Sequence, residues 1–151
     1  MTPVLLMRSL KTFLEGVVEN VELTSPKGVL TKPQVFLEQL PQKSASSQEE
    51  DFPFIIVRAA GGEDADGNKS TMKINLIIGT YSKDDDGFID VLNLFEDIRQ
   101  ALLKKRIVGK SFRMELPFIW RMFDEQPWPG WIGEINTLWT IPQVQEEVNF
   151  E

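Results

Sequence analysis

The sequence predicts a single α+β domain in which two helices pack on a mainly antiparallel sheet. Two long segments carry apolar residues at steps of three and four, which is the helical period, and several short segments alternate apolar with polar residues. The spacings between the short segments are those of hairpins, which favours antiparallel pairing. The 151 residues, 42% hydrophobic and 26% charged, suit one ordinary folded domain spanning 1–151.

The first expected element is a leading helix over about residues 3–19. Thr2 and Pro3 form a start signal, because a capping hydroxyl precedes a proline whose missing N–H costs nothing in the first turn. An apolar stripe follows at Met7, Leu10, Leu14, Val17 and Val21, with Leu6 and Phe13 beside it. The stripe could bind a partner, but a stripe of this width normally packs on the domain's own sheet, so we assign it to the core.

Residues 26–53 are rich in Pro, Ser, Gln and Glu, and only Val35, Phe36 and Leu37 can form a short strand there. We expect a flexible loop at about 41–52. A β-branched run at 54–57 and an alternating run at 72–78 predict two strands joined by a hairpin loop at about 60–70. Long loops inside compact domains often bind a partner, although a solvated loop is the simpler interpretation.

A second helix is predicted at about 87–106. Its apolar face comprises Phe88, Val91, Leu92, Phe95, Ile98 and Leu102. Acidic residues 84–86 precede it and basic residues 104–106 end it, which complements the helix dipole, and Gly109 is a natural stop. Further strands are expected from Phe112 to Leu116 and from Trp131 to Ile141, joined by a loop with Pro127 and Pro129.

Composition argues against several classes of function. The chain has no cysteine and no histidine, so it lacks disulfides, thiolate metal sites and the commonest general base. Its net charge of −7 disfavours a groove that holds nucleic acid by its phosphates. The N-terminal apolar run is too short for a signal peptide or a membrane span. We therefore expect a protein of the cytosol with no membrane and no specific nucleic acid as partner.

Three motifs suggest chemistry, and each has a simpler interpretation. Ser70 and Lys73 match the Ser-x-x-Lys pattern of acyl-enzymes, but on a strand positions three apart face opposite ways. The acidic residues at 63–66 lack the spacing of a calcium loop. Those at 84–86 are explained by their place before a helix. We expect no catalytic residue, no metal and no cofactor.

Four tryptophans lie within twenty residues, at positions 120, 128, 131 and 139. Part of this cluster belongs to the core. The Pro-Trp-Pro-Gly turn is exposed by its own chemistry, however, and tryptophan is enriched at interfaces. Trp128 and Trp131, which flank that turn, are therefore candidate interface residues.

In this order the segments resemble the small neck proteins of tailed bacteriophages and prophages, most closely the tail terminator (tail completion) family. The resemblance covers about residues 50–147. It rests on PFIIVR, on INLIIGTYSKDDDGFIDVLNLFEDIRQALL and on WPGWIGEINTLWTIPQV. These are structural patterns rather than catalytic signatures, so no family site residue can be transferred individually.

The resemblance implies a tail-terminator-like α+β subunit that forms a homo-oligomeric ring, expected to be a hexamer. Such a ring would cap the tail tube and meet the head-tail connector protein, in the host cytoplasm during assembly and then in the virion neck. By analogy, the segment 41–52 and the loop at 60–70, with Asp64 and Asp66, are candidates to contact tube or connector. The alternatives are a head-completion or minor tail component, or a small metal-dependent hydrolase or ligand-binding domain that would use Asp64, Asp66 or residues 84–86.

Overall fold

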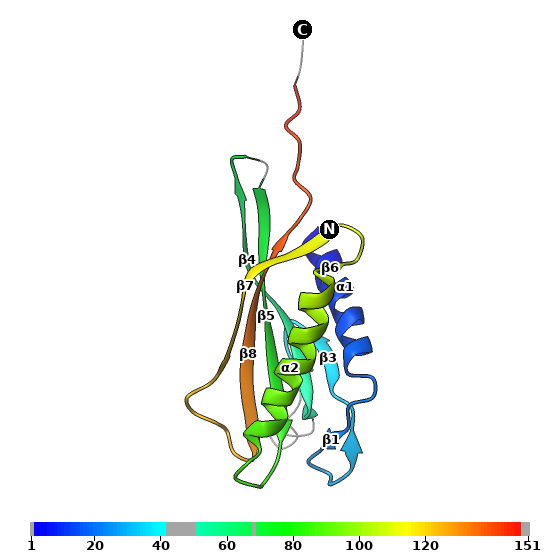
Figure 1. Ribbon diagram of the computed structural model, residues 1–151, viewed down its shortest axis with the longest axis vertical. Coiled ribbons are helices and arrows are strands. Elements are labelled where there is room, and N and C mark those ends of the chain that lie inside the picture. The colour runs from blue at the N-terminus through cyan, green and yellow to red at the C-terminus, as the bar shows by residue number, and fades with distance from the viewer. Residues whose placement is uncertain (1, 42–50, 68, 149–151) are drawn as a thin grey trace.

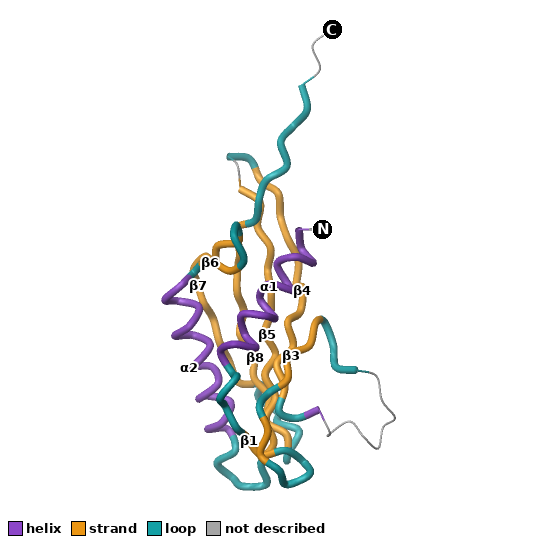
Figure 2. Tube along the Cα trace, turned by 90° about the vertical axis from the view of Figure 1, so that its right-hand side faces the viewer, coloured by secondary structure: helices purple, strands orange, loops and turns teal. Residues whose placement is uncertain are grey.

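The computed structural model describes residues 2–41, 51–67 and 69–148. The α+β prediction is confirmed. Within this part of the chain, two helices lie on one side of a six-stranded, mostly antiparallel sheet (Figure 1). A view turned by 90° brings the helices in front of the strands (Figure 2).

The helices are α1 (Thr2–Val17) and α2 (Phe88–Lys105), close to the ranges expected from the sequence. The apolar stripe of α1 is confirmed as core, because Leu6, Leu10 and Leu14 are fully buried. Helix α2 ends at Arg106, whose left-handed backbone lets its N–H donate to Leu102 O.

The strands of the main sheet are β3 (Gln34–Leu37), β4 (Phe54–Ala65), β5 (Lys69–Tyr81), β6 (Ile107–Val108), β7 (Phe112–Met122) and β8 (Gly130–Thr140). Their order is β3-β4-β5-β8-β7-β6, and only the β3–β4 pair is parallel. Two short strands, β1 (Leu23–Thr24) and β2 (Leu30–Thr31), form a separate ribbon. Helix α1 contacts β3, β4 and β6, whereas α2 contacts β5, β7 and β8.

The core lies between the helices and the sheet. Strand β5 supplies Ile74, Leu76 and Ile78 at alternate positions, all fully buried. Opposite them on β8, Ile135 pairs with Leu76 and Trp139 with Met72, while Trp131 pairs with Thr80 on the same face. The prediction that residues 131, 135 and 139 share one side of a strand is therefore confirmed.

Two predicted boundaries were wrong, and a third prediction is largely untested. The hairpin loop expected at about 60–70 is mostly strand, because β4 continues to Ala65 and β5 begins at Lys69. The strand expected to end at Leu116 continues to Met122. Of the flexible loop expected at about 41–52, residues 42–50 lie outside the described residues. Phe52, at its end, lies outside any helix or strand, and its ring packs on Phe54 with centroids 4.9 Å apart.

Candidate interaction surfaces

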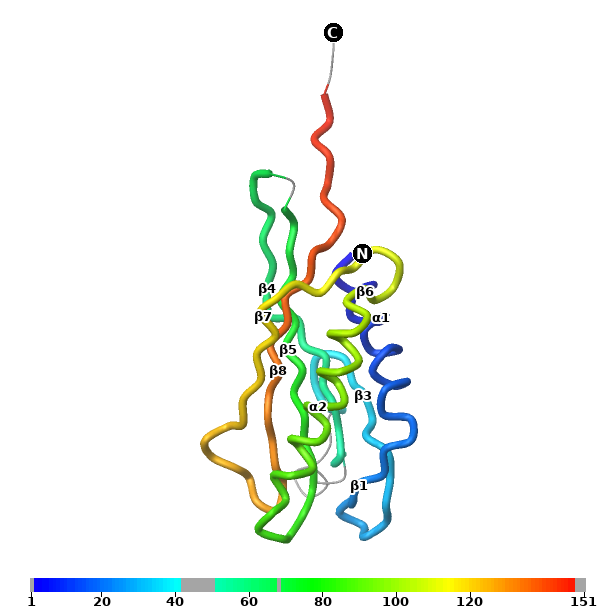
Figure 3. Tube along the Cα trace, in the orientation of Figure 1, coloured from blue at the N-terminus to red at the C-terminus, as the bar shows by residue number. Residues whose placement is uncertain are grey.

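The β4–β5 hairpin projects from one end of the domain, and it carries both acidic candidates (Figure 3). Asp64 lies near the end of β4, opposite Ser70 of β5, and its Oδ1 accepts a hydrogen bond of 2.7 Å from Ser70 Oγ. Asp66 is exposed in the turn that follows. Gly61 has a φ of +143° beside a bulge between Ala59 and Gly61, a conformation that residues with a Cβ rarely adopt.

The two tryptophans that flank the Pro-Gly turn have different environments. Trp128 is 58% exposed, so it is available to a partner. Trp131 is only partly exposed, and its Nε1–H donates to Ser82 O at 2.9 Å. Its ring also lies against Gly87 and Phe88 at the start of α2. Trp131 therefore anchors α2 to the sheet, and Trp128 is the more accessible interface candidate.

The structure does not bring the four candidate residues together. The hairpin of Asp64 and Asp66 projects beyond one end of the sheet, whereas the loop before β8 that carries Trp128 lies toward the other end (Figure 1). They therefore belong to two separate surfaces.

A third surface was missed by sequence reasoning. Leu116, Ile119 and Trp120 are 49–57% exposed along β7, and we call these three residues the β7 patch, although Ile119 and Trp120, as neighbours on a strand, face opposite sides of the sheet. Because the register with β8 shifts between Glu115 and Ile119, simple alternation from Phe112 does not predict which way they face. The available signal was the apolar run Leu116-Pro117-Phe118-Ile119-Trp120, which is unusual for a solvated connection.

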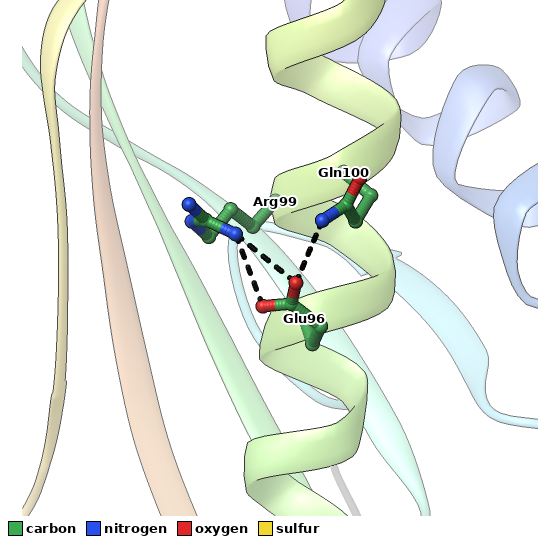
Figure 4. A network of polar contacts seen from close by, with 3 residues as sticks. All are labelled: Glu96, Arg99 and Gln100. Atoms are coloured by element: carbon green, nitrogen blue, oxygen red, sulfur yellow. Dashed lines mark hydrogen bonds and ion pairs between the residues drawn. The ribbon is translucent and has the colours of Figure 1, made fainter.

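Part of the β7 patch borders a groove of about 420 Å³ between α2 and β7, lined by Leu92, Phe95, Glu96, Arg99 and Trp120. The rings of Phe95 and Trp120 form its floor, with centroids 5.7 Å apart. Glu96 stands on the rim and accepts hydrogen bonds from Gln100 at 2.8 Å and from Arg99 at 3.0 Å (Figure 4). These bonds, chiefly the one from Gln100, lower the pKa of Glu96. The groove is thus apolar at its base and charged at its rim.

A smaller exposed apolar pair lies at the start of α1. Val4 and Leu5 are 41% and 56% exposed, and we call them the α1 patch. Helix α1 contacts β6 as well as β3 and β4, but its start lies beside the outer part of β4, where Pro3 lines a groove with Ala59 and Gly62, and β7 lies near the opposite edge of the sheet. The two patches therefore lie on different sides of the domain.

The acidic residues 84–86 lie in the bend and turn that precede α2. In the described part of the chain, no group of three or more carboxylates is placed to hold an ion. Asp90, in the first turn of α2, is partly buried, and this burial together with the nearby charge of Asp86 raises its pKa. Ser70 and Lys73 face opposite sides of β5, since Ser70 is buried and Lys73 exposed, as the strand period predicts.

After β8 the chain extends away from the domain beside the β4–β5 hairpin (Figure 3). Residues 142–148 form no helix or strand, and Val144 and Val148 are 87% and 66% exposed. This C-terminal segment also contains Glu146 and Glu147. None of the described helices is long and apolar enough to span a bilayer.

Comparison with known proteins does not identify the chain. No protein-family model matches it, and no curated protein is significantly similar to it.

Proposed function

We propose that this protein is a structural assembly protein that caps the tail tube of a tailed bacteriophage or prophage and provides the surface that joins tail to head. It would act as a ring of identical subunits, in the host cytoplasm during assembly and afterwards in the virion. The proposal starts from the resemblance of residues 50–147 to tail terminator proteins.

The observation that carries the proposal is that exposed apolar side chains occur at separate places on one small domain. These are the β7 patch, the α1 patch, and Val29 with Leu30 on the β1–β2 ribbon, which are 63% and 59% exposed. The β7 patch and the α1 patch are distinct in sequence and location. A closed ring of identical subunits uses two different surfaces of each subunit, joined head to tail. Monomeric proteins bury such side chains more often than they leave them clustered at the surface, so contact with another protein would account for both patches.

The two ends of the domain supply the other contacts that a cap requires. The β4–β5 hairpin with Asp64 and Asp66 projects from one end, and the loop of Trp128 lies toward the other (Figure 1). A subunit between tube and connector needs one surface for each of them, and these two ends are the candidates. The net charge of −7 favours a ring whose lumen repels DNA and lets it pass.

The test is to mix the purified chain with tail tubes built from the tube protein of the same phage or prophage. Negative-stain electron microscopy should show rings at the tube ends, and light scattering should show that tube growth stops. Tubes that keep growing with bare ends, at chain concentrations well above that of the ends, would exclude the capping role.

A further inference from the structure

We propose that residues 144–148 of one copy pair, as an added strand, with the open edge of β7 in a second copy. This inference deepens the proposed ring assembly and rests on it, since it names the contact between subunits. It combines three features of the surface: an unpaired strand edge, an apolar groove beside that edge, and an extended segment with no regular structure.

The edge of β7 is open over its second half. Along the first half of this edge, β6 pairs with Phe112 and Arg113. The next backbone N–H, that of Met114, donates to the carbonyl oxygen of Arg106, the residue before β6, at 2.7 Å. From Ile119 onward, β8 is the only strand of the described chain that pairs with β7. Such an edge is a template for a further strand.

The orientation of the backbone shows which groups are available. Phe123 N donates to Ile132 O of β8, so Phe123 bonds inward. Successive residues of an antiparallel strand direct their N–H and C=O groups to alternate sides. The backbone groups of Trp120 and Met122 therefore point toward the open edge, where a second chain can bond to them.

The side chains of the C-terminal segment match the groove beside this edge. In an extended chain Val144, Glu146 and Val148 share one face, because side chains alternate. The two valines suit the apolar floor of Phe95 and Trp120. Glu146, between them, can reach Arg99 on the rim, a charge-assisted contact.

The segment cannot occupy the edge of its own chain. Thr140 lies opposite Arg113, at the start of β7. The open edge begins six residues further along β7, at Ile119, which is about 20 Å at the rise of a strand. The four residues from Thr140 to Val144 span at most about 14 Å, and they must also cross β7 itself. The occupant is therefore the segment of a second copy.

Charge favours β7 over the other open edge. Strand β4 is paired by β3 only as far as Val57, so residues 60–65 also present a free edge among the described strands. That edge carries Glu63 and Asp64, which would repel Glu146 and Glu147 of the incoming segment. Beside the β7 edge, Arg121 pairs with Glu134 and Arg99 pairs with Glu96, so the charge there is balanced and not negative.

The experiment is a charge exchange in the full-length chain, with self-association measured by sedimentation velocity. Glu146→Arg and Arg99→Glu should each weaken association by about fivefold to tenfold, and the double variant should regain most of it. Glu147→Arg is the matched control, because position 147 faces away from the groove and should change association by less than about twofold.

A disulfide test then locates the contact, using the absence of natural cysteine. Two preparations, Val144→Cys and Met122→Cys, should form a mixed dimer on oxidation, because Met122 shares the groove face of β7 with Trp120, whereas Val144→Cys with Glu63→Cys should not. The proposal is overturned if the wild-type chain stays monomeric at every soluble concentration, if the charge exchange fails to restore association, or if the segment crosslinks to β4.

The outcomes separate this inference from the proposed function. If Glu146→Arg still forms rings on tube ends with wild-type affinity, the strand contact is wrong and the capping role stands. If association depends on Glu146 and Arg99 but no tube end is bound, the strand contact stands and the capping role is wrong.

Discussion

Trp128 and Trp131 are separated by two residues, and their different environments follow from what each side chain meets. Trp128 lies in a loop and has no core to enter, whereas Trp131 is on β8 on the face that the helices cover. Gly87 makes this packing possible, because the indole of Trp131 occupies the space where a Cβ would stand. A glycine at the start of α2 is thus a packing requirement.

We predict that Gly87→Ala destabilises the protein by about 1–3 kcal/mol, because the new methyl group overlaps the indole of Trp131. Gly16→Ala is the matched control. Gly16 lies in α1 with open space around it, so alanine should stabilise the fold by about 0.5–1 kcal/mol. Urea unfolding gives both values, and equal midpoints for the two variants would contradict this account of Trp131.

Two buried threonines on the central strands should respond oppositely to the same change. Thr137 Oγ1 donates to Ile74 O at 2.7 Å and accepts from Trp139 Nε1 at 2.8 Å. Thr80 Oγ1 is buried without a hydrogen-bond partner in the described chain. Valine has nearly the shape of threonine, so each replacement removes a hydroxyl without creating a large cavity.

Thr137→Val should therefore cost about 1–3 kcal/mol, because it leaves the buried indole N–H of Trp139 without its hydrogen-bond acceptor. Thr80→Val should be neutral or stabilising by up to about 1 kcal/mol, because a buried hydroxyl without a partner is itself unfavourable. Thermal unfolding of both variants tests the pair. A large loss at position 80 would show that its hydroxyl has a role that the fold does not explain.

At the scale of elements, the start of α2 is where pH should affect stability. Burial and the charge of Asp86 raise the pKa of Asp90 above its ordinary value, so folding favours the protonated carboxyl. Below about pH 4, the pKa of an unfolded aspartate, the carboxyl is protonated in both states and does not weaken the fold. As the pH rises through the higher pKa of the folded state, the carboxyl ionises in its partly buried site and the folded protein loses stability. Asp90→Asn removes this titration.

We therefore predict that the stability of Asp90→Asn relative to wild type increases as pH rises above about 4 and levels off once the carboxyl of Asp90 is ionised in the folded wild type. Urea unfolding at several pH values measures the difference. Asp85→Asn, an exposed change beside the same helix, controls for general charge effects. A flat difference for Asp90→Asn would mean that its carboxyl is solvated in the folded protein.

The elements that the sequence predicts best are those whose pattern is set by burial. The spacing of apolar residues alone predicts both helices, and it also predicts the face of β8 that Ile135 and Trp139 share. The apolar side chains that set this spacing are buried in the core. The outer half of β4 does not, since Ala-Gly-Gly-Glu-Asp has little strand propensity and becomes strand by pairing with β5. Such pairing is a tertiary effect that a local pattern cannot contain.

The same distinction holds for the candidate surfaces: those that depend on local turn chemistry were predicted, and the one that depends on tertiary contacts was missed. The exposed Trp128 was predicted from turn chemistry, and Asp66 lies in a turn as acidic, glycine-rich segments favour. The β7 patch was missed because Pro117 suggests the end of a strand, whereas β7 passes it with a shifted register. Trp120 then reaches the groove beside α2, a neighbour that is remote in sequence.

For the whole molecule, one set of apolar side chains stabilises the folded domain, and a different, exposed set is available for contacts between copies. The core between the helices and the sheet is complete without the patch residues, since its side chains, such as Leu10, Ile74 and Trp139, are fully buried in the single chain. The β7 and α1 patches lie outside it and stay about half exposed. Changing them should therefore affect contacts between copies while leaving the stability of the single domain nearly unchanged.

We accordingly predict that Ile119→Glu and Leu5→Glu each prevent ring formation, because each places a charge in one of the two surfaces that a ring must join. Val29→Glu is the matched control, since Val29 is 63% exposed and lies with Leu30 at the β1–β2 ribbon, outside both patches. Sedimentation velocity with and without tail tubes reports assembly, and melting temperatures should stay within a few degrees of wild type. If Val29→Glu also prevented assembly, or if both patch variants still formed rings, the heterologous contact would have to involve other surfaces.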